Sequence, residues 1–266
     1  MMKKQLLLLI TIVSLFSCSK DNNKVIDDIP DSNNIEEQIV GRWMPVQTLL
    51  NNQVTYDRNI HTGLENDTHY ERRLYKEDKT VRLSNNDGSI NLFTWELNAT
   101  ADSIIIAKEL SNERRYLLEY VSNDSLSFSI EPFSGHKVVY SFIKEHNETI
   151  NRNDLITKDW KYDFVWARLF SMDGYKYIRN GSVTNDFYEN AKVSFHNDGS
   201  FIITSGNNTI HEQGTWHLNL DDMQLIIEGN YTREATLLEL TQDTMVFVFK
   251  NSQDNNINYQ MDFSTF

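Results

Sequence analysis

The sequence predicts an all-β protein built from two tandem antiparallel domains, and three observations support this. The hairpin turn Asn86–Ser89 precedes a strand that carries Trp95, and the similar turn Asn197–Ser200 precedes a strand that carries Trp216. In the strands that follow, apolar residues recur at every second position, which is the period of a half-buried strand. No long helical pattern separates the strands, so we expect an antiparallel meander in each half.

Length and composition fit this prediction. A chain of 266 residues is long enough for two domains of ordinary size. Its 12 tyrosines and 14 phenylalanines favour strands over disorder. The formal net charge of −13 repels the phosphates of nucleic acids, so we expect no nucleic-acid partner. The single cysteine excludes an intrachain disulfide and also excludes thiol chemistry in the folded part.

Residues 1–17 have the parts of a secretory signal: a basic pair, then an apolar run from Leu6 to Phe16 that is too short to span a bilayer. Cys18 follows directly. The segment Leu15-Phe16-Ser17-Cys18 resembles the bacterial lipobox. The resemblance implies cleavage before Cys18, a diacylglyceryl group on its thiol and a further acyl chain, such as palmitate, on its new amine. Several acyl chains give stable membrane anchoring. The alternative is an ordinary cleaved signal followed by an incidental cysteine.

Residues 18–34 are polar and show no period, which indicates a lipidated cysteine followed by a flexible tether. Ser19 is not the aspartate that retains lipoproteins in the inner membrane of enteric bacteria. Lys20-Asp21 resembles the start of a surface-export signal. We therefore expect a lipid-anchored outer-membrane protein that faces the periplasm or the cell surface.

The remaining chain divides into residues 35–146, a polar linker at residues 147–154, and residues 155–266. Each half contains about eight or nine short strands, a number typical of a small closed barrel or a sandwich. Similar segments recur in one order in both halves, which indicates an internal duplication. The matched segments are Ile104–Ile106 with Leu225–Ile227, Arg115–Glu119 with Glu234–Glu239 through a shared Leu-Leu-Glu, Asp124–Phe128 with Asp243–Phe247, and Tyr140 with Tyr259.

Gly41-Arg42-Trp43 follows a short predicted helical turn and precedes the first strand. It resembles the Gly-x-Trp signature of the lipocalins, and the later hairpins and strands are similar to lipocalin-like domains of bacterial lipoproteins. The resemblance implies an up-and-down β-barrel in each half, which in this family can hold a small apolar ligand. It also implies that Trp43 closes one barrel end; internal alignment gives Trp160 the same role, although Lys158-Asp159 replaces the Gly-x pair there.

An aromatic residue at every second position from Trp160 to Trp166 would place a stripe on one strand face. Core packing is the favoured interpretation of this stripe. If the protein has a ligand-binding surface, its first candidates are Tyr162, Phe164 and Trp166.

Trp95 and Trp216 share their strand faces with apolar neighbours, so we expect both in the core. His211 and His217 have the opposite parity to Trp216 and should face outward. Neither lies in a His-Glu-x-x-His pattern, and we predict no metal site.

The chain has no Gly-x-Ser-x-Gly elbow, no phosphate loop and no glycine-rich dinucleotide turn. We therefore predict no catalytic residue and no cofactor, and expect a non-enzymatic protein that binds a small apolar molecule or a protein partner. The alternative is a surface glycan-binding or adhesin module with exposed aromatic residues, for example Tyr175 and Tyr177. A hydrolase on a β-scaffold is the weakest hypothesis.

One strand differs between the halves. Ser125, Ser127 and Ser129 are predicted to face water in the first half, whereas the matching strand of the second half carries Val246 and Val248. An apolar outer face requires cover. We therefore expect the other domain, or a partner, to pack on these valines.

Overall fold

The structure is a computed structural model of the whole chain. Residues 1–31 lie outside the part that it describes, so the predictions for the signal segment, Cys18 and most of the tether remain predictions. The described residues are 32–61, 67–85, 87–108, 110–145, 151–171, 174–179, 191–219, 221, 223–250 and 257–266.

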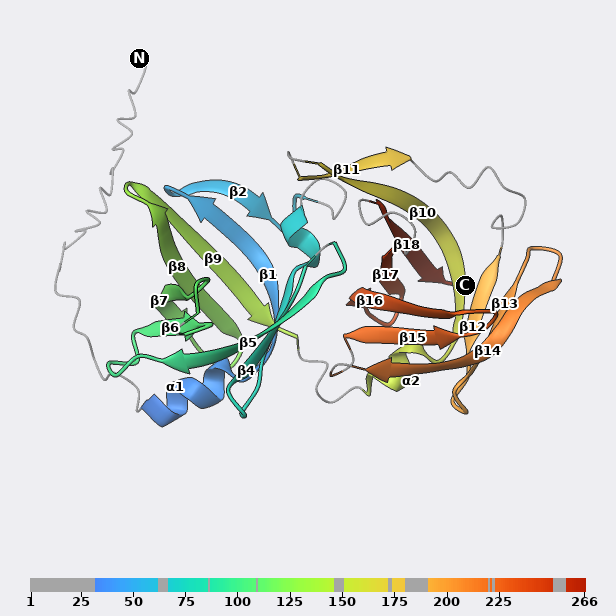
Figure 1. The fold of residues 1–266 in the computed structure, drawn as a ribbon, viewed down its shortest axis with the longest axis horizontal. Helices are drawn as coiled ribbons and strands as arrows, with labels where there is room; N and C mark the ends of the chain where they lie inside the picture. The colour runs from blue at the N-terminus through green and yellow to red at the C-terminus, as the bar shows by residue number, and fades with distance from the viewer. Residues whose placement is uncertain are drawn as a thin grey trace, which may run out of the picture. The chain divides into compact units, whose positions relative to one another are not determined.

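The first half forms a closed antiparallel barrel (Figure 1). Helix α1 (Ser32–Ile39) leads into it, and a 3-10 turn, η1 (Asp67–Tyr70), precedes the third strand. The strands are β1 (Gly41–Leu50), β2 (Gln53–Asp57), β3 (Arg72–Tyr75), β4 (Thr80–Ser84), β5 (Ile90–Leu97), β6 (Ser103–Ile106), β7 (Arg114–Val121), β8 (Ser125–Phe133) and β9 (His136–Lys144).

The second half repeats this order after the short helix α2 (Arg152–Ile156). Its strands are β10 (Asp159–Ser171), β11 (Gly174–Arg179), β12 (Lys192–Phe195), β13 (Ser200–Thr204), β14 (Ile210–Asn219), β15 (Gln224–Glu228), β16 (Thr232–Leu240), β17 (Thr244–Lys250) and β18 (Ile257–Thr265).

Each sheet closes because its first strand pairs with its last. Strand β1 pairs with β3 at one end and with β9 along its length, and β10 does the same with β12 and β18. The result is a ring of eight strands in each half, while β2 and β11 pair only with the far ends of β1 and β10. The all-β prediction is confirmed, and closure decides in favour of barrels over sandwiches. A closed ring leaves no exposed strand edge along which chains could aggregate.

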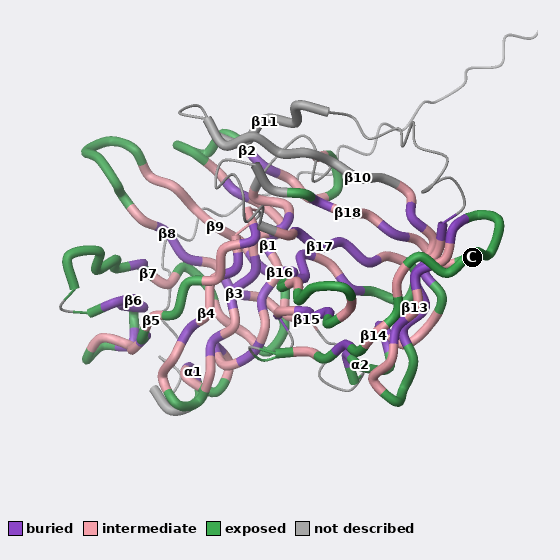
Figure 2. The backbone as a smooth tube through the Cα atoms, turned by 45° about the vertical axis from the view of Figure 1, so that its right-hand side comes forward, coloured by how far each residue is buried: buried purple, intermediate pink, exposed green. Residues whose placement is uncertain are grey.

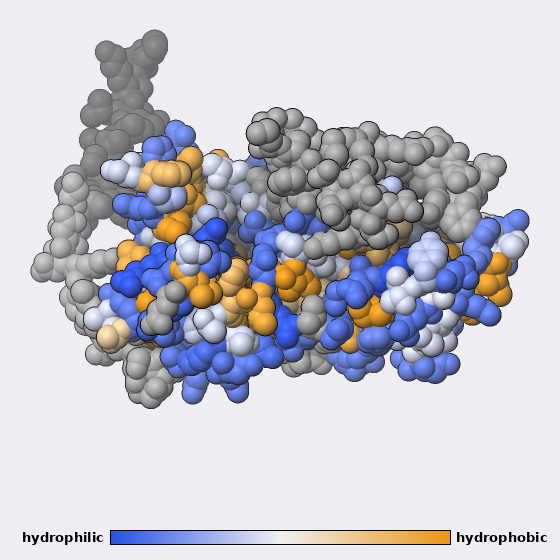
Figure 3. All heavy atoms as spheres, viewed as in Figure 1, coloured by the Kyte–Doolittle hydropathy of each residue, from blue (hydrophilic) through white to orange (hydrophobic). Residues whose placement is uncertain are grey.

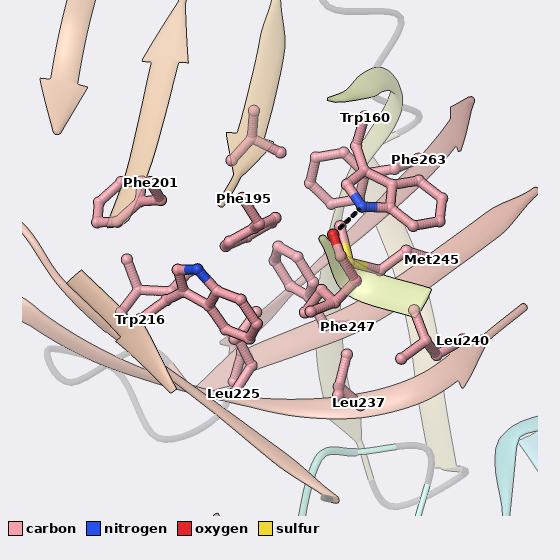
Figure 4. Packing of buried hydrophobic residues seen from close by; sticks show 14 of the residues in the cluster. Trp160, Phe195, Phe201, Trp216, Leu225, Leu237, Leu240, Met245, Phe247 and Phe263 are labelled. Carbon is pink, nitrogen blue, oxygen red and sulfur yellow. Dashed lines mark hydrogen bonds between the residues drawn. The ribbon is translucent and has the colours of Figure 1, made fainter. Parts of the chain in front are cut away.

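One tryptophan packs at the entry of each barrel, as the internal alignment predicts. Trp43 and Trp160 are both 0% exposed. The indole Nε1 of Trp43 donates to the carbonyl of Ile39 at 2.7 Å, and that of Trp160 donates to the carbonyl of Ile156 at 2.8 Å (Figure 4). In both halves the ring therefore binds the last turn of the preceding helix, where carbonyls lack helical partners. Gly41 begins β1 with a φ of 135°, which favours glycine.

The second pair of tryptophans also occupies equivalent places. Trp95 is opposite Ile106 and Trp216 is opposite Ile227 in the sheet registers. Both rings are buried, which confirms the prediction of core packing. Trp216 lies edge-on to Phe195, with ring centroids 5.3 Å apart (Figure 4). These matched positions support the internal duplication.

The registers correct one anchor of the predicted alignment. Phe128 is opposite Leu118, and its equivalent Phe247 is opposite Leu237 rather than Leu238. The shared Leu-Leu-Glu is thus offset by one residue between the halves. A β-bulge follows each pair at equivalent positions, so the bulges do not cause the offset; the Leu-Leu-Glu triplet itself stands one residue later in β16 than in β7.

A second anchor is also wrong. Phe128 is opposite Tyr140, whereas Phe247 is opposite Met261, two residues beyond Tyr259. Tyr140 and Tyr259 have the same spacing along the chain but not the same position in the sheet, because the connection from β17 to β18 is longer than that from β8 to β9. Tyr259 is 39% exposed and does not occupy the place of Tyr140 in the core.

Burial alternates along many strands, which places one face of the sheet inside each barrel (Figure 2). The coloured surface in Figure 3 is mostly hydrophilic, with hydrophobic residues in small groups between hydrophilic ones. Among the residues described, we find no helix with the length and apolar character needed to cross a membrane.

Candidate functional site

The second barrel contains a cavity of about 280 Å³. Its walls come from the eight strands of the ring and from the β15–β16 turn, and most of the lining side chains are aromatic or aliphatic. The lining residues are Tyr162, Val193, Phe195, Ile203, His211, Glu212, Ile227, Tyr231, Arg233, Phe247, Phe249 and Met261. A concave, mainly apolar hollow with a few polar groups is the usual form of a small-molecule site.

Two substitutions between the halves explain why there is room here. Arg73 and Val193 occupy equivalent positions, since each is opposite the signature tryptophan of its barrel. Tyr116 and Ala235 are also equivalent. Tyr116 is opposite Ile104 in β6, and Ala235 is opposite Leu225, the matching residue of β15. The second barrel therefore has two smaller side chains where the first has two large ones, and interior volume that is not filled by side chains becomes cavity.

The corresponding space in the first barrel is occupied by a buried cation. The guanidinium of Arg73, which is only 8% exposed, lies over four aromatic rings at 4.8–5.7 Å from their centroids. These rings belong to Tyr116, Phe128, Tyr140 and Phe142. Cation–π attraction strengthens when the cation is removed from water. We interpret this cluster as core packing that fills the first barrel.

One ion pair supplies the charge in the cavity of the second barrel. The Nη2 atom of Arg233 lies 2.6 Å from Oε1 of Glu212. The backbone N–H of Asn230 donates to the same oxygen at 3.1 Å. A Cβ atom at Gly229 would lie 2.1 Å from it, so the absence of a side chain at Gly229 makes room for the carboxylate. The ring of Tyr231 covers the guanidinium at 5.1 Å.

Our sequence predictions missed both members of this pair, although a signal was present. Arg233 has the same parity as the buried Ala235 and Leu237 in β16, and Glu212 has the same parity as Trp216 in β14. A charged residue at an inward position of an otherwise apolar strand is unusual and often marks a site. The same parity that places His211 and His217 on the outer face of β14 places Glu212 on its inner face.

Of the predicted ligand candidates, Tyr162 lines the cavity and is 8% exposed. Its ring lies 4.4 Å from that of Phe263. Between Tyr162 and Phe164 the pairing with β18 shifts by one residue, at Asp163. The alternation that would put the whole aromatic stripe on one face is therefore interrupted there. The side chains of Phe164 and Trp166 lie outside the described residues.

The predicted outward histidines are exposed, and His211 lies at the rim of the cavity. His217 lies further along the same strand. Within the described ranges, no group of three or more histidine, cysteine or acidic side chains is arranged to hold a metal ion. The side chains of Tyr175 and Tyr177, candidates for glycan stacking, are not among those described.

The apolar face predicted on β17 is covered by the other domain. Val246 and Val248 are 3% and 1% exposed, and they form a small buried cluster with Leu238 and with Tyr70 of the first half. The hydroxyl of Thr236 donates to the carbonyl of Gly88 across the same contact, at 2.6 Å. The prediction that this face is covered is confirmed, and the cover comes from the same chain.

The bulge in β16 explains why this face exists only on the second barrel. The unpaired residue of that bulge is Leu238, whereas the equivalent residue in β7 is Glu119. The carboxylate of Glu119 accepts from Ser129 at 2.7 Å and pairs with Lys137. The first barrel thus has a polar outer face where the second has an apolar one, and only the second requires cover.

Charged groups surround this contact. Asp221 pairs with Arg82 at 2.8 Å, and Glu239 pairs with Arg58 at 3.5 Å. His69 lies 3.9 Å from Glu239, but burial, together with the nearby arginines, lowers the pKa of its imidazole to about 4. This imidazole is therefore neutral at pH 7. A hollow of about 400 Å³ beside the Arg58–Glu239 pair is lined mainly by charged and polar residues, and its apolar wall is supplied by Ile60, Tyr70, Val246 and Phe263.

We expect the double change Val246→Ser and Val248→Ser to lower the free energy of unfolding by about 3 kcal/mol, because two buried valines lose apolar contact. Urea unfolding measures the loss, and hydrogen exchange should rise in η1. Val54→Ser is the control, since Val54 is 53% exposed. Unchanged stability and exchange in the double variant would contradict the role of this face.

Comparisons with known proteins add little to this picture. No family model matches the chain, and no curated protein matches it. Among solved structures, it is similar to a protein of unknown function from the DUF3598 family of Nostoc punctiforme PCC 73102, at 9% identity, over 90% of this chain and 100% of that chain. The TM-score is 0.25, so the similarity supports no conclusion about fold or function.

Proposed function

We propose that this protein is a non-enzymatic, outer-membrane-anchored lipoprotein whose second barrel binds a small, mainly apolar molecule. The observation that carries the proposal is the cavity of about 280 Å³, lined by aromatic and aliphatic side chains, in a barrel whose duplicate is filled at the equivalent positions. If one liquid water occupies about 30 Å³, the cavity has room for about nine non-hydrogen atoms. The proposed ligand is therefore about the size of a ring with a short head group.

The chemistry of the cavity supports binding rather than catalysis. Among the described residues that line it there is no serine, threonine or cysteine. Its carboxylate, Glu212, is held by Arg233 and by a backbone N–H. The oxygen that holds these two contacts is already engaged and is not free to take a proton from a ligand.

The anchor rests on the sequence. The only cysteine, Cys18, stands where lipidation requires it. The polar residues 19–31, which precede α1, could reach about 44 Å when extended, at about 3.4 Å per residue. A barrel held on such a tether would meet small molecules near the membrane without entering it.

The test uses residues 19–266, which lack the signal and the anchor, produced in the periplasm of a Gram-negative host. Native mass spectrometry before and after organic extraction should show extra mass that extraction removes. Val193→Phe should remove this mass, because the ring fills the cavity as large side chains do in the first barrel. The matched variant Val54→Phe, on the surface, should retain it. The proposal would be contradicted if the protein had only the mass of its polypeptide before extraction and if the wild-type chain also bound no small aromatic probe.

A further inference from the structure

We propose that the cavity of the second barrel selects ligands with a neutral polar head group, such as an amide, over ligands with a carboxylate. This inference rests on the function proposed above and concerns the chemistry of the ligand. It follows from the way in which Glu212 covers Arg233.

The positive charge of Arg233 is already compensated inside the cavity. Its Nη2 atom lies in ionic contact with Glu212, and both Nε and Nη2 are buried and make no hydrogen bond of regular geometry. Nε and Nη2 form the edge of a guanidinium that binds the two oxygens of a carboxylate side by side. A ligand carboxylate could reach this edge only by displacing Glu212.

The position of Glu212 is built into the fold by three independent features. Arg233 attracts the carboxylate, the N–H of Asn230 donates to it, and Gly229 leaves the space that it occupies. The side chain is 10% exposed. A carboxylate in such a mostly buried place is costly to displace, because it would lose both its ion pair with Arg233 and the N–H donor of Asn230.

A second negative charge beside Glu212 would be repelled. At about 4 Å, and with the effective dielectric constant of a protein surface, repulsion between two unit charges exceeds the free energy of a tenfold change in affinity. A neutral head group avoids this repulsion and can still accept or donate hydrogen bonds at the ion pair. The surrounding walls, which include Phe247 and Phe249, suit an aromatic body.

The experiment compares benzamide with benzoate, which have nearly the same shape and differ in charge. Residues 19–266 are titrated with each probe, and binding is followed by the amide chemical shifts of cavity residues and by saturation-transfer signals. We expect benzamide to bind the wild-type chain at least about tenfold more tightly than benzoate. Glu212→Gln should raise the affinity for benzoate by about tenfold or more and change that for benzamide by less than about threefold.

Two further variants separate the effect of the Glu212 carboxylate from that of the net charge of the chain. Gly229→Ala should act like Glu212→Gln in part, because its methyl group displaces the carboxylate without changing the charge of the chain. Glu96→Gln makes the same change of net charge on the surface of the first barrel, where Glu96 pairs with Lys108, and should leave both affinities unchanged.

The outcomes separate this inference from the function on which it rests. If benzoate binds the wild-type chain as tightly as benzamide, the head-group inference is wrong and the ligand cavity stands. If Glu212→Gln and Glu96→Gln have equal effects, selection by Glu212 is also wrong. If neither probe binds any variant and the extracted protein carries no extra mass, the proposed function fails together with the inference.

Discussion

Replacing Trp160 with alanine is expected to lower the free energy of unfolding of the second barrel by about 4 kcal/mol. The ring is fully buried in the main core of this barrel, and its removal leaves a void that rigid neighbouring strands cannot fill. It also leaves the carbonyl of Ile156 without the indole donor at the end of α2. Both losses act at the point where the helix and the first strand meet.

Hydrogen exchange read by mass spectrometry is the appropriate measurement, because it reports on each barrel separately. Trp160→Phe should cost about half as much, since it keeps most of the apolar area and loses the N–H donor. Trp43→Ala should produce the corresponding loss in the first barrel. Ile210→Ala is the control in the second barrel, where Ile210 is 56% exposed. A loss below about 1 kcal/mol in Trp160→Ala would show that the entry tryptophan is not a main source of stability.

The second large effect is expected at Glu145, directly after β9. Its Oε1 accepts from Nε of Arg72 at 2.5 Å, and its Oε2 lies 3.8 Å from both Arg42 and Arg152. Arg152 belongs to α2, so this carboxylate joins the first barrel to the entry of the second. Glu145→Ala leaves three arginines, two of them buried, without a shared counter-charge, and should cost about 3–4 kcal/mol. Chemical unfolding at pH 7 measures the loss.

The same group gives a pH dependence with a defined sign. Burial raises the pKa of the Glu145 carboxyl, but the attraction of Arg72, Arg152 and Arg42 outweighs burial, so the pKa lies below its ordinary value of 4.5. The folded chain therefore keeps the carboxylate ionised where the unfolded chain protonates it. Its stabilisation is complete above about pH 4.5 and is lost as the pH falls below that value.

Glu145→Gln tests this directly. The difference in unfolding free energy between wild type and Glu145→Gln should be largest at pH 7 and shrink between about pH 4.5 and pH 3. The surface variant Glu96→Gln should show a smaller difference at every pH, because its salt bridge with Lys108 is largely exposed. A Glu145→Gln difference that stays constant down to pH 3 would mean that the ionised carboxylate does not contribute as proposed.

The sequence by itself determined the fold class, the duplication and the roles of four tryptophans. The fold class, the duplication and the core packing of Trp95 and Trp216 follow from local rules, namely hairpin turns such as Asn197–Ser200 and alternating apolar residues. The role of Trp43 follows from the resemblance to lipocalins, and internal alignment extends it to Trp160. It also supplied the prediction that Val246 and Val248 need cover, since parity alone placed them on an outer face. The membrane anchor at Cys18 remains a prediction from the sequence.

Tertiary structure decided closure, register and the cavity. Bulges at Asp163 and Leu238 shift the pairing by one residue. Simple alternation does not reveal them, because the extra residue of a bulge is defined only by how the strand pairs with its neighbour. The cavity is lined by Val193, which stands where the first barrel has Arg73. Ala235 stands where the first barrel has Tyr116, over whose ring Arg73 lies. Whether an interior is full or hollow is a sum of side-chain volumes brought together only by the closed ring, and for that reason the sequence alone could not locate the candidate site.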